Sequence, residues 1–99
     1  MADTELDSPE FLPLPKQHRY SLLLDSQTVA ITVYSDHLKQ RTFLHTEVDP
    51  EHGGRGYATR LIRSALDDCR AQDYTVVARC PTVAAFIAKN ADYQDLVAR

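Results

Sequence analysis

The chain has 99 residues, with 11 lysines and arginines, 14 aspartates and glutamates, and a net charge of −3. This length allows one domain with a single modest core. Charges of both signs are interspersed, which argues against a nucleic-acid partner, because phosphate binding needs a basic stripe. No apolar run reaches the length of a membrane span, and the N-terminus lacks the pattern of a signal peptide. We therefore expect a cytoplasmic protein with no nucleic-acid or membrane partner.

The first fifteen residues, MADTELDSPEFLPLP, differ in composition from the rest of the chain. They hold four acidic side chains, no basic one and three of the five prolines. This composition is typical of a solvated arm. Because the arm takes four of the 14 acids, the remainder keeps 10 against all 11 basic residues. We expect a flexible acidic arm over residues 1–15 and a nearly neutral domain over residues 16–99.

Three β-prone runs follow this arm. RYSLLL (19–24) and TVAITVY (28–34) are joined by the polar residues 25–27, a link short enough for a hairpin. After a polar turn expected at residues 35–37, the alternating run KQRTFLHTEV (39–48) follows. The three runs predict three antiparallel strands.

From Arg55 the apolar residues recur at three- and four-residue steps, which predicts a long helix that ends at about Gln72. TVVARC (75–80) predicts a strand that runs parallel to the strand before the preceding helix. TVAAFIAKN (82–90) predicts a short helix with Asn90 as its C-terminal cap. Together these elements predict an α+β domain with a mixed sheet, in the compact order β-β-β-α-β-α. The apolar residues that predict the long helix are Ala58, Leu61, Ile62, Ala65, Leu66 and Cys69.

All three glycines of the chain, Gly53, Gly54 and Gly56, lie in the loop EHGGRGYA before the long helix. The first N–H groups of a helix lack partners and its dipole is positive there, so such a loop lets a phosphate approach. The alternative is that the glycines only allow a tight turn. Thr59 stands where both the Walker loop and the dinucleotide motif need a glycine, so neither nucleotide class is supported.

Cys80 ends a predicted strand and is followed by Pro81 and a helix start. This position would aim the thiol at free N–H groups and lower its pKa, whereas the alternative is a small buried apolar residue. A phosphatase-type cysteine loop would need arginine where Phe86 stands. The other cysteine, Cys69, belongs to the apolar stripe of the long helix and is expected in the core.

His45 and Glu47 lie two residues apart, on one face of the third strand. Imidazole and carboxylate are suited to proton transfer near neutral pH, so they could form an acid/base pair. The alternative is two polar residues on a solvated sheet face. We expect no metal site, because the other histidines show no zinc-like spacing with the cysteines.

Three ordered motifs resemble those of the GCN5-related N-acetyltransferase superfamily. They are HTEV (45–48), RGYA (55–58) and CPTV (80–83). More narrowly, the chain is similar to the short, single-domain YidJ-type branch, whose ending the terminal ADYQDLV also resembles. The resemblance covers residues 19–97, and three motifs in register are more specific than one.

The resemblance implies that the protein binds acetyl-CoA as co-substrate and transfers the acetyl group to an unidentified amine acceptor. It implies Glu47 or His45 as general base, and Cys80 as acyl carrier or as general acid. The pyrophosphate would lie on the glycine loop, and the pantetheine arm would lie between diverging strands, next to Val48. The implied cofactor-binding residues are Val48, Gly53, Gly54, Arg55, Gly56, Tyr57, Ala58 and Thr59.

Two positions depart from the family pattern. Gly53 replaces the first, long polar residue of Q/R-x-x-G-x-G/A, and Asn90 and Ala91 stand where this branch often has His and Pro. The further strands that usually help to build the acceptor site are not predicted here. The alternative function is therefore a non-catalytic CoA-binding or protein-interaction module. We expect a monomer or a weak homo-oligomer.

Overall fold

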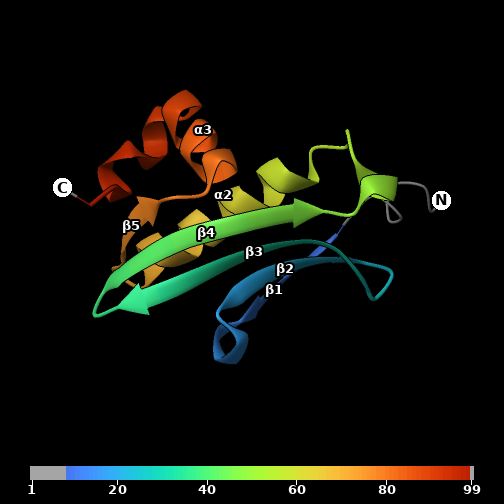
Figure 1. Ribbon diagram of the computed structural model, residues 1–99, viewed down its shortest axis with the longest axis horizontal. Helices are drawn as coiled ribbons and strands as arrows, with labels where there is room; N and C mark the ends of the chain where they lie inside the picture. Colours follow the sequence, from blue (N-terminus) through green and yellow to red (C-terminus); the bar gives the residue numbers. More distant parts are fainter. Residues whose placement is uncertain (1–8, 99) are drawn as a thin grey trace.

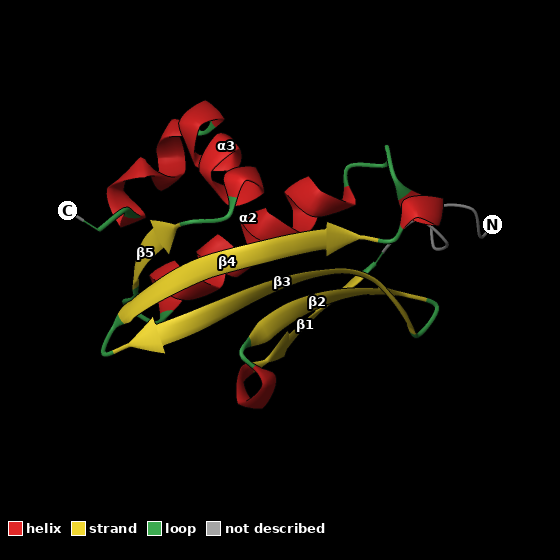
Figure 2. Ribbon diagram, in the orientation of Figure 1, coloured by secondary structure: helices red, strands yellow, loops and turns green. Residues whose placement is uncertain are grey.

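The computed structural model describes residues 9–98, which form one sheet with helices packed against it (Figure 1). The sheet order is β1-β2-β3-β4-β5; the first four strands are antiparallel and β5 runs parallel to β4 (Figure 2). The α+β class with a mixed sheet is confirmed. The strands are β1 (Glu10–Leu14), β2 (Arg19–Leu24), β3 (Gln27–His37), β4 (Gln40–Val48) and β5 (Thr75–Ala78). The helices are α2 (Tyr57–Ala71) and α3 (Pro81–Lys89), with short 3-10 helices η1 (Pro15–Gln17), η2 (Pro50–His52) and η3 (Ala91–Leu96).

β1 was not expected from the sequence. It pairs antiparallel with β2, and the ring of Phe11 stacks on that of Tyr20 with the centroids 5.4 Å apart. Pro13 lacks an N–H group, but it is tolerated because β1 is an edge strand. The prediction of an arm over residues 1–15 is therefore wrong where β1 lies, because its apolar side chains outweigh the prolines. The part of that arm over residues 1–8 lies outside the described residues.

The two hairpins differ in how well they were predicted. The β2–β3 turn consists of Asp25 (φ 52°) and Ser26 (φ 67°), which is the left-handed pair that a two-residue hairpin favours, so this hairpin is confirmed. The turn expected at residues 35–37 is wrong, because these residues continue β3, and His37 pairs with Gln40. The strand accommodates these polar residues because Ser35 and His37 are exposed and Asp36 binds Arg41 of β4.

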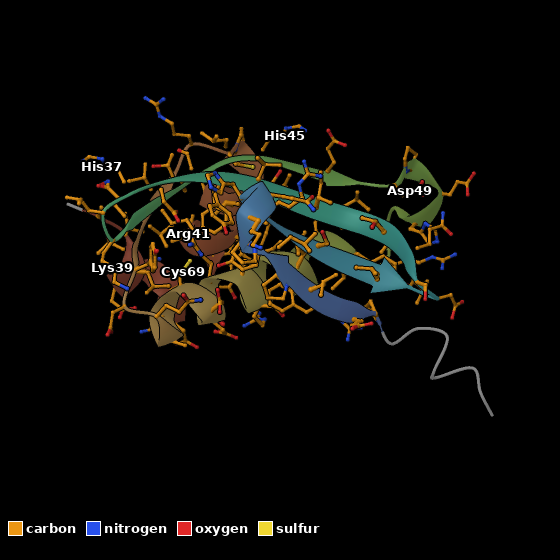
Figure 3. All side chains as sticks on the ribbon, turned by 90° about the horizontal axis from the view of Figure 1, so that it is seen from below. His37, Lys39, Arg41, His45, Asp49 and Cys69 are labelled. Atoms are coloured by element: carbon orange, nitrogen blue, oxygen red, sulfur yellow. The ribbon has the colours of Figure 1, made fainter. Side chains whose placement is uncertain are left out.

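α2 carries the predicted apolar stripe and packs on β2, β3 and β4. α3 packs beside α2, where the guanidinium of Arg63 lies 5.2 Å from the centre of the Phe86 ring. In Figure 3, Cys69 lies on the helix side of the sheet and His45 on the opposite side. We call these sides the helix face and the far face. The buried residues of α2 are Tyr57, Leu61, Ile62, Ala65, Leu66 and Cys69.

A buried arginine, Arg41 of β4, joins the sheet to α2. It is 5% exposed, and its Nε and Nη2 each donate to a carboxylate oxygen of Asp36 at 2.8 Å. It also donates to the Tyr20 hydroxyl, which donates to Asp68 of α2 at 2.6 Å. Burial is the largest single effect on Arg41 and opposes its charge, but the Asp36 hydrogen bonds together with the charge interactions of Tyr20, Tyr34 and Asp36 raise its pKa. The sequence patterns gave no sign of this network.

Candidate functional site

The glycine loop leaves the start of α2 open. Gly54 (φ 77°) and Gly56 (φ 78°) adopt the left-handed conformation, and a Cβ at either would meet no atom within 4 Å. Gly53 has an ordinary φ of −66°, and a Cβ there would lie 3.5 Å from the Pro50 carbonyl oxygen, which is normal contact. Two of the three glycines are thus required by the backbone, while Gly53 is not.

The first turn of α2 is free of competing acceptors. Gly56 is its N-cap, no side chain accepts a hydrogen bond there, and the first turn holds no acidic residue. The Tyr57 side chain is buried at 3% exposure, so this predicted site residue can offer a ligand only its backbone. The exposed side chains of Arg55 and Thr59 flank the helix start. The N–H groups of this turn are therefore suited to an anion.

A groove of about 430 Å³ begins at this same turn and runs between α2 and α3. The predicted residues Ala58 and Thr59 lie in it, but the α3 side was not foreseen, since only the packed structure brings α3 next to α2. Exposed cations, Arg63 and Lys89, line the groove from the two helices. The full lining is Ala58, Thr59, Ile62, Arg63, Thr82, Ala85, Phe86, Lys89 and Asn90.

β4 and β5 separate next to this groove. Their pairing ends at Phe43 and Ala78, and the backbone N–H groups of Arg79 and Cys80 both donate to the Phe43 carbonyl, at 3.0 and 2.9 Å. A bulge in the β3–β4 pairing makes Leu44 the extra residue of β4. Beyond it, β4 pairs only with β3 within the described range.

The unpaired edge of β4 offers backbone groups. Asp49 donates its N–H to the Val29 carbonyl of β3 at 2.8 Å. Because backbone groups alternate between the two sides of a strand, those of Thr46 and Val48 point away from β3, toward the open edge. Val48 is thus placed where an extended ligand could add to the sheet by backbone hydrogen bonds.

Cys80 is the N-cap of α3, and its contact with Thr46 of β4 places it on the helix face. Its Sγ is 3.3 Å from the Thr46 hydroxyl, which is 2.9 Å from the hydroxyl of Thr32. Burial alone would raise the Cys80 pKa, but hydrogen bonds from Thr46 and from the N–H groups of Val83 and Thr82 lower it. Cys80 is only 2% exposed, so it combines the predicted acidic thiol with the alternative of a buried residue.

His45 and Glu47 form a hydrogen-bonded pair on the far face. His45 Nε2 lies 2.8 Å from Glu47 Oε2, and the two side chains are 59% and 64% exposed. Because side chains alternate along β4, the side chain of Thr46, which lies between them in sequence, points to the opposite face and contacts Cys80 there. The structure therefore joins His45 to Glu47 but places both across the strand from Cys80.

Residues 9–98 provide neither a cluster of metal-binding side chains nor a membrane-spanning helix. None of their His, Cys, Asp and Glu side chains gather in threes or more in a way that could hold a metal ion. None of their helices has the length and apolar character needed to cross a membrane.

Comparison with known proteins identifies the family. The family model for the GCN5-related N-acetyl-transferase matches residues 19–96, whereas no curated protein matches the chain. An NMR solution structure of a GCN5-like protein from Staphylococcus aureus is 20% identical, with a TM-score of 0.70 over 90% of this chain and 87% of that one. The crystal structure of a ribosomal-protein-alanine N-acetyltransferase from Brucella melitensis biovar Abortus 2308 is also 20% identical. There the TM-score is 0.57 over 82% of this chain, which spans only 63% of that enzyme.

Both structures share the fold of this chain, and the family model covers most of its length. The open helix start, the groove between α2 and α3 and the separating strands lie within the matched residues. The chain belongs to the GCN5-related N-acetyl-transferase family.

Proposed function

We propose that this protein binds acetyl-CoA and transfers its acetyl group to an amine. One observation carries the proposal: the uncapped start of α2 opens into the groove between α2 and α3, beside the unpaired edge of β4. An anion site, an elongated groove and a free strand edge together suit a long ligand with an anionic segment. Membership of the acetyltransferase family supports the same ligand.

The backbone N–H groups from Gly54 to Thr59 would bind the pyrophosphate, since the left-handed glycines leave open space in front of them. Arg55 is exposed beside this turn and would add a charged contact. The backbone of Val48 would hydrogen-bond the amide-bearing pantetheine arm along the open edge of β4. Gly53 adds no side chain, so the backbone carries most of this site.

Acetyl-CoA supplies an acetyl group that is activated as a thioester. On the far face Glu47 would take a proton from the amine, directly or through a water, while His45 holds the carboxylate at 2.8 Å. Two roles fit Cys80, whose pKa is lowered: it would carry the acetyl group as a thioester, or protonate the departing CoA thiolate.

Binding and turnover test the proposal separately. Calorimetry should detect acetyl-CoA binding in the wild type and lose it in Gly56→Ala, because a side chain at φ 78° strains the turn that presents the amides. Gly53→Ala is the matched control, since its φ of −66° suits alanine. Wild-type protein that does not bind acetyl-CoA at millimolar concentration would rule out the proposal.

Release of CoA with a panel of amines then separates an enzyme from a non-catalytic CoA-binding or protein-interaction module. Binding without any amine-dependent CoA release would favour the module. Intact-mass measurement with acetyl-CoA tests the roles of Cys80, since an acetyl adduct that persists in Cys80→Ala would exclude the carrier role.

We also assign the chain to the short, single-domain YidJ-type branch, on the strength of its HTEV and CPTV motifs. The cytoplasmic location, the lack of a nucleic-acid partner and the monomeric or weakly oligomeric state remain predictions.

A further inference from the structure

A second cavity, of about 380 Å³, lies beside Glu47. Its charged lining consists of Arg19, Glu47 and Asp49, and the partly exposed Ile31 adds apolar surface. The strand register brings these residues together, because Ile31 pairs with Glu47 across β3 and β4. Arg19 pairs with Val33, two residues along from Ile31, and so shares its face. The cavity therefore opens on the far face and shares Glu47 with the proposed reaction site.

Arg19 lacks a partner in this cavity. Its Nε is buried and has no hydrogen-bond partner within the described part of the chain. Neither acid of the cavity pairs with Arg19: Glu47 contacts His45 at 2.8 Å, and Asp49 accepts the N–H of Glu51 at 3.0 Å and lies 3.5 Å from His52 Nδ1. An unpaired buried guanidinium N–H is costly. Such an atom in a cavity points to a ligand that carries an anionic acceptor.

The charges of the lining restrict the ligand further. A simple anion would satisfy Arg19 but would face the carboxylates of Glu47 and Asp49. A simple amine would satisfy those carboxylates but would leave Arg19 unpaired. A ligand that carries both a carboxylate and an ammonium group satisfies all three residues, and its hydrocarbon part would contact Ile31. The volume of about 380 Å³ lies in the range of small-ligand sites.

We propose that this cavity binds the acetyl acceptor, and that the acceptor is a small zwitterionic amine of the amino-acid class. Arg19 would bind its carboxylate through paired N–H groups, and Glu47 would bind its ammonium. This inference rests on the proposed acetyl transfer, because it names the acceptor of that reaction.

The geometry accounts for transfer and for release. Glu47 takes a proton from the ammonium, the amine nitrogen attacks the thioester carbonyl carbon, the C–S bond breaks, and the nitrogen loses a second proton. One of these protons ends on the CoA thiolate, so the products are the N-acetyl amino acid, CoA and one proton. The product has lost its positive charge and keeps its carboxylate. Repulsion from Glu47 and Asp49 would then favour its release.

NMR of the labelled full-length protein tests binding without acetyl-CoA. The probes are leucine, phenylalanine and lysine, each compared with its decarboxylated amine and its α-N-acetyl derivative. At least one amino acid should shift the amide signals of Arg19, Ile31 and Glu47, and should bind about tenfold or more tightly than its amine and its acetylated form. Binding of no amino acid, or equal binding of the amine, would overturn the proposal.

Two variants localise the effect. Arg19→Gln should weaken amino-acid binding roughly tenfold or more, and Lys16→Gln, which removes an exposed charge, should not. If Arg19→Gln loses its folded spectrum, the wild-type comparison of amino acid with amine still decides. An acetyl-CoA titration of the same samples reports at the start of α2, so failure of CoA binding and failure of acceptor binding are told apart.

Discussion

At the scale of single residues, the site depends on small polar groups that the sequence pattern does not mark. Thr46 bonds Cys80 on one side and Thr32 on the other, and Thr32 is fully buried in the core. The position of Cys80 before a helix could be read from the sequence. The role of Thr46 could not, because it depends on the register that sets β4 opposite β3.

The Thr46 hydroxyl should help to hold the Cys80 thiol acidic. Thr46→Val removes a hydrogen bond to the thiolate, so the pKa of Cys80 should rise and its thiolate fraction at neutral pH should fall. The pH dependence of alkylation, followed on the Cys80 peptide by mass spectrometry, measures this shift. Thr28→Val changes an exposed threonine and should leave the profile unchanged. An unaltered midpoint in Thr46→Val would contradict the assignment.

Gly53 should accept the side chain that the family pattern places there. Gly53→Arg should fold normally and bind acetyl-CoA about two- to tenfold more tightly, the worth of one added hydrogen bond to an anion at an exposed site. Gly54→Arg is the matched comparison, and at φ 77° it should lose about 1 to 3 kcal/mol of stability. Calorimetry and thermal unfolding measure both effects. Weaker binding in Gly53→Arg would show that the pyrophosphate lies elsewhere.

At the scale of the elements, helices and strands with a local sequence pattern could be predicted, whereas the packing between them could not. The stripe of α2 and the Asn90 cap were read correctly, and the cap side chain donates to the Phe86 carbonyl at 2.7 Å. β1 was missed because the acidic and proline-rich composition of residues 1–15 predicts an unstructured arm, although the strand's apolar side chains pack on the sheet. The bulge at Leu44 and the groove between α2 and α3 depend on contacts between distant segments, which no local pattern encodes.

The Arg41 network should contribute strongly to stability. Asp36→Ala leaves the buried guanidinium without its bidentate partner, and should cost about 3 kcal/mol in the free energy of unfolding. Asp95→Ala breaks the exposed pair with Arg70 and should change stability little. Urea denaturation of both variants provides the comparison, and equal effects would contradict the structural role of Arg41.

At the scale of the whole molecule, one sheet separates the two proposed binding sites. The helix face holds the proposed CoA groove with Cys80, and the far face holds the Arg19 cavity with Glu47. The open stretch of β4 lies between them. A small chain can thus present two ligands to each other from opposite sides of one strand.

Ligand binding to this domain should appear as thermal stabilisation. Acetyl-CoA at one hundred times its dissociation constant should add about 2.7 kcal/mol to the unfolding free energy, and so raise the melting temperature. Gly56→Ala should lose this rise, whereas Gly53→Ala should keep it. A rise of equal size in Gly56→Ala would place the ligand away from the α2 start.

A crystal structure of the protein with acetyl-CoA tests the proposed site most directly. If the proposed site is correct, the pyrophosphate lies on the amides from Gly54 to Thr59, the pantetheine arm runs along Thr46 and Val48, and the thioester lies between Cys80 and Glu47. Acetyl-CoA bound on another surface, with the groove between α2 and α3 left empty, would contradict the proposed site.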